Sequence, residues 1–205
     1  MEQIILLGSG GHAGSVMDSI MQLKQYKIAG FIERETAEKT ADTGLPIIGT
    51  DNDLKAIYDA GIRNAFVTVG YLGKGNVRER IYDRLKQIGY RIPSIIDPSA
   101  ILADKVLIEE GAYVGKRAVI NANSHIGKMS IINTGVIVEH DNEIGDFSHI
   151  AVGSVLCGNV KIGERTLIGA NATVIQGIKV GSNVIVGAGT TVRHEIESGQ
   201  TYYGK

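Results

Sequence analysis

The sequence contains no tryptophan, and phenylalanine and tyrosine account for only 5% of its 205 residues. A core without large rings has to be filled by aliphatic side chains packed in layers. The chain has a single cysteine, Cys157, which excludes an intrachain disulfide and is typical of a reducing compartment. We therefore expect an aliphatic core that is stabilised without covalent cross-links.

The chain also lacks an excess of charge of one sign, and it lacks long apolar segments. Its formal net charge of −1 gives no electrostatic reason to expect nucleic acid or an anionic membrane as a partner. No stretch approaches the roughly 18 apolar residues of a membrane span. Residues 1–11 lack the basic region of a signal peptide. We expect a cytoplasmic protein with no membrane insertion and no nucleic-acid partner.

An aliphatic residue recurs at every sixth position in the second half of the chain, which is also rich in glycine. The sixteen positions are Leu102, Ile108, Val114, Ile120, Ile126, Ile132, Val138, Ile144, Ile150, Leu156, Ile162, Ile168, Val174, Val180, Val186 and Val192. Glycine often follows the aliphatic residue, and a small residue often lies two positions before it. A period of six fits neither an α-helix nor a flat strand. It fits a short strand followed by a turn, repeated many times.

Three such units would make one triangular coil with the aliphatic side chains inside and the small residues at the corners. Successive coils would stack by parallel hydrogen bonding at about 4.8 Å each. We expect the glycine after the aliphatic residue to supply backbone freedom next to the turn. The pattern resembles the hexapeptide-repeat proteins. That resemblance implies a left-handed parallel β-helix, a homotrimer and usually an acyl-CoA-dependent transferase.

Residues 1–95 have a different pattern, in which buried strands alternate with amphipathic helices. Strands are predicted at 4–7, 27–32 and 64–69, and helices at 16–23, 51–60, which residues 46–49 precede, and 77–88. This alternation predicts a parallel sheet. The fold class is thus a small α/β Rossmann-like domain over residues 1–95, followed by an all-β left-handed parallel β-helix over residues 96–205.

A glycine turn follows the first predicted strand. Gly8, Gly10 and Ala13 form a partial dinucleotide fingerprint, in which glycine lets a phosphate approach the backbone at a helix N-terminus. Glu33 ends the second strand, about where a ribose-binding acid would lie. A complete NAD domain needs six strands, for which fewer than 100 residues are too few. The motif therefore indicates a small nucleotide site, and the alternative is a turn that only packs.

His140 is the leading candidate for catalysis because it lies between two carboxylates, Glu139 and Asp141. Acyl transfer from a thioester to an amine or hydroxyl needs a base, and an imidazole with an unperturbed pKa near 6.5 suits that role. Either neighbouring carboxylate could orient the ring and stabilise its charged form.

The other histidines of the repeat and its cysteine are weaker candidates for a catalytic or metal-binding role. His125 and His149 each lie one position before an aliphatic residue, and for His125 a solvated or packing position is favoured. Cys157 directly follows Leu156 of the core and has no adjacent base, which disfavours a covalent acyl intermediate. The spacing of the histidines does not match the zinc-binding members that share this coil, so no metal is expected.

The chain as a whole is similar to the PglD/NeuD family of bacterial sugar acetyltransferases. The resemblance is carried by the Gly-His loop, the small sheet domain, and the segments 138–141 and 157–163 within the repeat. It implies that His140 is the general base, that Asp141 is its carboxylate partner, and that acetyl-CoA is the acyl donor. It implies substrate-binding roles for Gly10, Gly11, His12, Glu33, Asn133 and Glu139. It implies acetyl-CoA-binding roles for His149, Gly158, Ala170, Gly187 and Gly189.

The function expected from this resemblance is N-acetylation of a UDP-linked amino sugar in glycan or polysaccharide biosynthesis. Two alternatives are an O-acetyltransferase acting on sialic acid or another sugar, and a nucleotide-binding scaffold without catalysis. Two departures from the family bear on the ligands. The segment 70–76 is longer than the usual turn, and the usual C-terminal motif is shortened to Tyr203, Gly204 and Lys205.

Overall fold

The structure is a computed structural model that describes residues 1–34 and 43–204, and it consists of two compact units. The first unit comprises Met1–Gly70 and Asn76–Ile95. The second comprises the short segment Tyr71–Gly75 together with the residues from Ile96 onward. The segment Tyr71–Gly75 therefore belongs with the C-terminal unit, although it lies far from it in the sequence.

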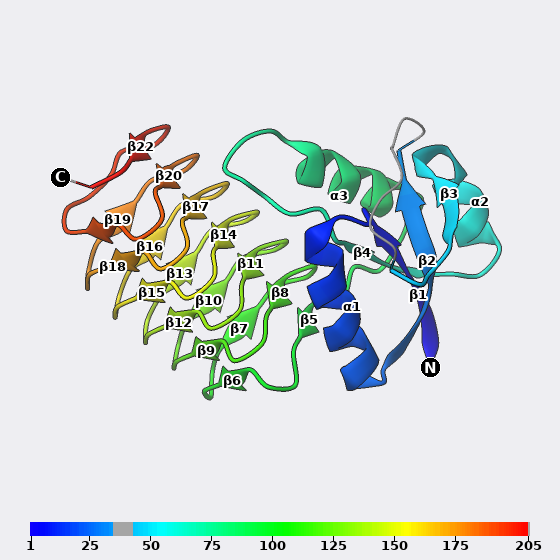
Figure 1. Ribbon diagram of the computed structural model, residues 1–205, viewed down its shortest axis with the longest axis horizontal. Coiled ribbons are helices and arrows are strands. Elements are labelled where there is room, and N and C mark those ends of the chain that lie inside the picture. Colours follow the sequence, from blue (N-terminus) through cyan, green and yellow to red (C-terminus); the bar gives the residue numbers. More distant parts are fainter. Residues whose placement is uncertain (35–42, 205) are drawn as a thin grey trace. The chain divides into compact units, whose positions relative to one another are not determined.

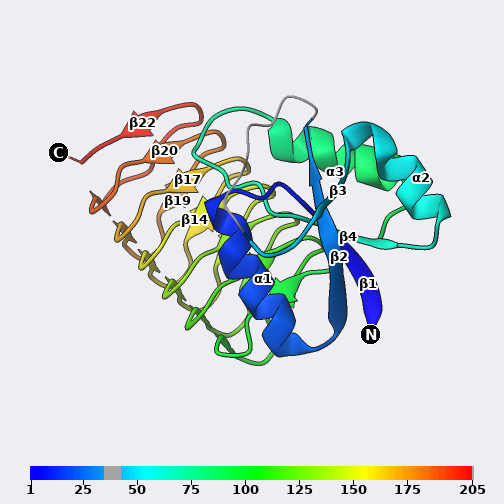
Figure 2. The ribbon, with the colours of Figure 1, turned by 45° about the vertical axis from the view of Figure 1, so that its right-hand side comes forward.

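The first unit is a four-stranded parallel sheet in the order β3-β2-β1-β4, with helices on both faces (Figure 2). The strands are β1 (Glu2–Leu7), β2 (Tyr26–Glu33), β3 (Ile47–Thr50) and β4 (Asn64–Val67). The helices are α1 (Gly11–Leu23), the 3₁₀ turn η1 (Asp51–Asp53), α2 (Leu54–Asp59) and α3 (Val77–Ile88). Ile4, Ile5 and Leu6 of the central strand are fully buried. The predicted α/β architecture of this part is confirmed.

The second unit consists of two-residue strands that form three parallel sheets, stacked as the coils of a left-handed β-helix (Figure 1). One sheet contains β7 (Leu107–Ile108), β10 (His125–Ile126), β13 (Glu143–Ile144), β16 (Lys161–Ile162) and β19 (Lys179–Val180). A second contains β6 (Ile101–Leu102), β9 (Val119–Ile120), β12 (Ile137–Val138), β15 (Val155–Leu156), β18 (Thr173–Val174) and β21 (Thr191–Val192). The third contains β5 (Ile95–Ile96), β8 (Tyr113–Val114), β11 (Ile131–Ile132), β14 (His149–Ile150), β17 (Leu167–Ile168), β20 (Ile185–Val186) and β22 (Thr201–Tyr202).

The aliphatic positions of the repeat form the core of the coil, as the sequence predicts. Every one of them from Val114 to Val192 is buried, and Leu102 and Ile108 are partly buried against the end of the same column. Residues one coil apart pair in register, so that Ile126 lies between Ile108 and Ile144. Burying one such side chain stabilises the fold by about 1.5–3 kcal/mol. The register changes only after Val192, where Thr201 pairs with Ile185.

The glycines of the repeat have a different role from the expected one. The residue with a left-handed backbone is the third after each aliphatic position, for example Asn123, Asp141 and Gly153. Gly145, which directly follows an aliphatic residue, has no positive φ. A Cβ on it would lie 2.6 Å from the backbone nitrogen of Glu164 in the next coil. The expectation that these glycines supply backbone freedom was wrong, because they are needed for the close approach of successive coils.

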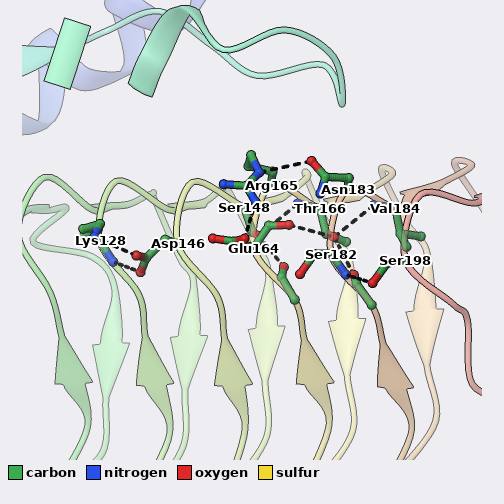
Figure 3. Close-up of polar contacts among 12 residues, drawn as sticks. Lys128, Asp146, Ser148, Glu164, Arg165, Thr166, Ser182, Asn183, Val184 and Ser198 are labelled. Carbon is green, nitrogen blue, oxygen red and sulfur yellow. Dashed lines mark hydrogen bonds and ion pairs between the residues drawn. The ribbon is translucent and has the colours of Figure 1, made fainter. Parts of the chain in front are cut away.

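Buried polar side chains tie the coils together at the corners (Figure 3). The hydroxyl of Ser148 donates to the carbonyl of Gly163 at 2.8 Å and accepts from the amide of Thr166 at 3.0 Å. Thr166 repeats this pattern in the next coil with Gly181 at 2.8 Å and Val184 at 3.1 Å. Ser148 and Thr166 thus each join their own coil to the following one and have their buried hydroxyls satisfied as donor and acceptor.

Candidate active site

His140 lies on an exposed corner of the coil, two residues after the end of β12. Its side chain is 60% exposed, and Nδ1 donates a hydrogen bond to Oδ2 of Asp141 at 2.7 Å. Asp141 adopts the left-handed corner conformation and also accepts from the side-chain amide of Asn123 at 3.0 Å. The pKa of Asp141 is lowered, first by the hydrogen bond from His140 and second by that from Asn123. An ionised Asp141 fixes the proton on Nδ1 and leaves Nε2 as the basic nitrogen.

The sequence left open whether Glu139 or Asp141 orients the imidazole, and the structure places Asp141 there. Glu139 lies directly before His140 at a half-buried position. Gly158, which follows one coil later, lies against the ring. A Cβ on Gly158 would be 2.6 Å from both Cε1 and Nε2 of His140. Because Gly158 has no positive φ, glycine is needed there for space and not for conformation.

His149 has a very different environment, on the outer surface of β14. It is only 9% exposed, because the segment Tyr71–Gly75 covers it. Its Nδ1 donates to the backbone carbonyl of Tyr71 at 2.7 Å, and its Nε2 lies 3.2 Å from the amide nitrogen of Asn133. The hydroxyl of Tyr71 in turn donates to the carbonyl of Arg165 at 2.8 Å. These contacts describe a neutral imidazole with the proton on Nδ1 and bring the predicted residues Asn133 and His149 together.

Three of the predicted acetyl-CoA residues, Ala170, Gly187 and Gly189, lie next to the sheet that carries His149, whereas Gly158 lies against His140. Gly187 directly follows β20, and Gly189 donates from its backbone nitrogen to the carbonyl of Ala170 at 2.8 Å. A Cβ on Gly187 would lie 2.7 Å from the ring of Tyr203, whereas nothing lies within 4 Å of such an atom on Gly189. Ala170 and Gly189 thus form one corner, which is separate from the corner of His140.

Within one chain, the structure does not bring His140 and His149 into one site. His140 lies between β12 and β13, which belong to two different sheets, and His149 lies on the third sheet. In a triangular coil, a corner between two sheets is opposite the third. The predicted catalytic pair is therefore opposite the face of His149. Ala170, Gly187 and Gly189 lie at the corner between the sheets of β14 and β12, across the sheet of β12 from the corner of His140.

The glycine loop of the first unit has the geometry of an anion site. Gly10 caps the N-terminus of α1, and no atom lies within 4 Å of a Cβ built on Gly10 or Gly11. His12 is the second residue of this helix. Glu33 is joined to the loop through Oε1, which accepts from the hydroxyl of Ser9 at 2.6 Å and from its backbone nitrogen. Open amides at a helix N-terminus favour an anion such as a phosphate.

Comparison with known proteins shows the family of the chain. A family profile described as the PglD N-terminal domain matches residues 3–85, and one described as the hexapeptide repeat of succinyl-transferase matches residues 159–193. PerB from Caulobacter crescentus, solved with CoA and GDP-perosamine, is 32% identical with a TM-score of 0.89 over 97% of this chain and 92% of its own. The acetyltransferase domain of PglB from Neisseria gonorrhoeae, solved with acetyl coenzyme A, is 30% identical with a TM-score of 0.87 over 98% and 95%.

The chain belongs to the PglD/NeuD-type sugar acetyltransferases. It is therefore an acyltransferase of the hexapeptide-repeat superfamily, as the resemblance implied. A histidine-to-alanine variant of a GDP-perosamine N-acetyltransferase from Caulobacter crescentus is 30% identical, with a TM-score of 0.91 over 98% of this chain and 93% of its own. No curated protein sequence matches the chain. In the part of the transferase that the structure describes, no helix is long and apolar enough to cross a membrane.

Sequence reasoning missed two residues of the transferase that contact the candidate site. Tyr71 covers His149, and no sequence pattern indicates that a residue so distant would reach the coil. Asn142 lies beneath the corner of His140, and in this case the sequence contains a pattern that could have indicated it. It is the one amide among the fifteen corner positions from Val106 to Thr190, which otherwise carry small or aliphatic residues.

Proposed function

We propose that this transferase moves the acetyl group of acetyl-CoA to the amino group of a nucleotide-linked amino sugar. The observation that carries the proposal is the exposed His140 imidazole, held by Asp141 with Nε2 as its basic nitrogen. The relatives solved with CoA, acetyl coenzyme A and GDP-perosamine support the two substrate classes. No metal is needed for this chemistry, because the thioester is already activated.

The proposed reaction is a direct acyl transfer. Nε2 of His140 removes a proton as the amine nitrogen attacks the thioester carbonyl, and a C–N bond forms. The tetrahedral intermediate collapses by cleavage of the C–S bond, and the CoA thiolate takes a proton. Asp141 keeps the imidazole in the productive tautomer and stabilises its charged form. Backbone amides of the coil stabilise the oxyanion.

For the sugar nucleotide we propose the glycine loop of the first unit as the diphosphate site. The open backbone at Gly10 and Gly11 supports this assignment, with His12 in the first turn of the helix and Glu33 close to the loop. The sequence suggested UDP, whereas the Caulobacter structures contain GDP-perosamine. We retain UDP as the expected nucleotide. Asn133 and Glu139 complete the proposed sugar-binding set.

We further propose that the enzyme is a homotrimer in which the site lies between protomers. The proposed acetyl-CoA residues are His149, Gly158, Ala170, Gly187 and Gly189. The support comes from the separation of all of them except Gly158 from His140 within one chain. A second copy can bring these two sides together. The sheet of β12 also carries outward apolar side chains, of which Ile101 is 64% and Ile137 is 37% exposed. Burying this face in an interface would remove apolar surface from water.

The test is thiol release from acetyl-CoA with a panel of UDP- and GDP-linked amino sugars. We expect turnover with an amine acceptor and none with the matching sugar that has a hydroxyl in its place. Protection from thermal unfolding by UDP, but not by GDP or CMP, would support the proposed nucleotide. Turnover only with free sialic acid would favour the O-acetyltransferase. Failure of acetyl-CoA to bind at millimolar concentration would support the non-catalytic scaffold.

A further inference from the structure

Asn142 is a fully buried amide at the corner of the coil that carries His140. It lies two residues after His140 and two before Ile144 of the core, and none of its surface is exposed. Its oxygen accepts from the backbone nitrogen of Val160 at 3.1 Å, and its nitrogen donates to the carbonyl of Cys157 at 3.0 Å. These two bonds join Asn142 to the next coil in the same way as the corner hydroxyls described above.

The amide of Asn142 makes one further contact that the hydroxyl of Thr166 does not match, from its nitrogen to the carbonyl of Glu139. Its approach to the carbonyl of His140, at 3.4 Å, is matched at Thr166, whose hydroxyl lies 3.4 Å from the carbonyl of Glu164. The peptide groups of Glu139 and His140 lie on the short segment that carries the imidazole. A hydroxyl has one proton to donate, whereas an amide has two and a separate acceptor oxygen. Asn142 can therefore join the coils and hold the segment of His140 at the same time.

The corner at Thr166 shows what a hydroxyl alone provides. Thr166 is also fully buried, donates to the carbonyl of Gly181 and accepts from the amide of Val184 (Figure 3). A threonine or serine at position 142 could make the matching bonds to Cys157 and Val160. It would lose the bond to the carbonyl of Glu139. That carbonyl would then accept from one side chain, the hydroxyl of Ser124 at 2.9 Å. The described part of the chain thus contains its own example of a corner side chain without a bond to the carbonyl three residues before it.

We propose that Asn142 is a positioning residue for the reaction. Its side-chain amide fixes the peptide groups of Glu139 and His140 from inside the coil and so sets the direction of the His140 imidazole. The inference rests on the proposed role of His140 as the base. His140 is exposed. Among the residues that the structure describes, its ring has a hydrogen bond only to Asp141. The direction of the ring therefore depends on how firmly the backbone of His140 is held. A small displacement of a catalytic group lowers the rate strongly.

The variant that tests this proposal is Asn142→Thr, which keeps the volume and the bonds between coils but removes the bond to the carbonyl of Glu139. Asn142→Ser is the second variant, in case threonine does not fit. We expect kcat to fall about tenfold or more while KM for acetyl-CoA stays within about twofold. Thr166→Ala is the matched control, because it removes corner bonds away from His140. It should lower Tm and leave kcat unchanged.

A second measurement separates this inference from the proposed function. In the full-length protein, ¹⁵N NMR of the His140 ring reports which nitrogen carries the proton, independently of turnover. We expect the Nδ1–H form in the wild type and a mixture of tautomers in both Asn142 variants. A wild-type kcat together with an unchanged tautomer in a folded variant would overturn the inference. An active His140→Ala enzyme would instead refute the role of His140, and the NMR result would still show whether Asn142 holds the ring.

Discussion

The corner of His140 and the face of His149 place the same side chain in opposite environments. His140 is exposed, with Nδ1 bound to an ionised carboxylate and Nε2 directed over Gly158. His149 is buried, and both of its ring nitrogens are engaged by Tyr71 and Asn133. A base needs a lone pair that substrate can reach, and a structural imidazole needs both nitrogens satisfied. The environment of His140 favours proton transfer, and that of His149 favours a fixed position of the segment Tyr71–Gly75.

The largest expected effect is that of His140→Ala. Removal of the general base should lower kcat by roughly 10²–10⁴-fold and leave binding of acetyl-CoA largely intact. The measurement is steady-state thiol release, with acetyl-CoA binding followed by calorimetry. His125→Ala is the control, since His125 is a half-exposed histidine that pairs with Glu109 and not with Asp141. Near-normal turnover of His140→Ala would exclude this residue from the mechanism.

Gly158→Ala should have the next largest effect. The added Cβ would take the place of the His140 ring and push it off the wall of the coil, which should lower kcat by on the order of tenfold to a hundredfold. Steady-state kinetics measure the effect, and a crystal structure of the variant would show the new ring position. Gln176→Ala, one coil further along the same corner, should change neither kcat nor the position of the His140 ring. An unmoved ring in the variant would contradict this explanation.

Asp141→Asn should reduce kcat by on the order of tenfold, because an amide orients the imidazole but does not stabilise its charge. The lowered pKa of Asp141 means that its contribution to folding is present above pH 3.8 and is lost as the pH falls through its value in the folded state. The variant should lack that acid-dependent loss of Tm. Asp146→Asn, which removes a carboxylate paired with Lys128, is the control for activity. Equal kcat in both variants would argue against a role for Asp141.

On the face of His149 we expect changes in stability. His149→Phe keeps the ring but removes its bonds to Tyr71 and Asn133, which should lower the free energy of unfolding by about 1–3 kcal/mol. Denaturant titration measures this change, and limited proteolysis should show faster cleavage within Tyr71–Gly75. Unchanged stability would show that the contact with Tyr71 does not hold the segment.

The smallest expected effect is that of Tyr71→Phe. It removes one hydrogen bond, from the phenol to the carbonyl of Arg165, and should cost about 0.5–1.5 kcal/mol. The same denaturant titration gives the value. A larger loss than that of His149→Phe would reverse the order of the two contacts and indicate that the phenol, not the imidazole, anchors the segment.

Much of the fold follows from the sequence because the coil is a local structure with a constant period. The aliphatic positions predict the buried column, and the helix at 77–88 and the first strand were also predicted. The predicted strand at 64–69 is shorter and ends at Val67. The role of Gly145 could not be predicted from the six-residue period, because glycine is needed there to make room for the backbone of the next coil at Glu164.

By itself, the sequence determined the column of aliphatic residues, the corner that presents His140 and the carboxylate beside it. These features depend on residues within a few positions of one another. The tertiary structure showed the bond from the imidazole to Asp141, which the resemblance had implied, and it alone decided that Gly158 makes room for the ring and that Tyr71 buries His149. Each of these depends on the direction of a side chain or on contacts between residues at least one coil apart, which spacing along the chain does not encode.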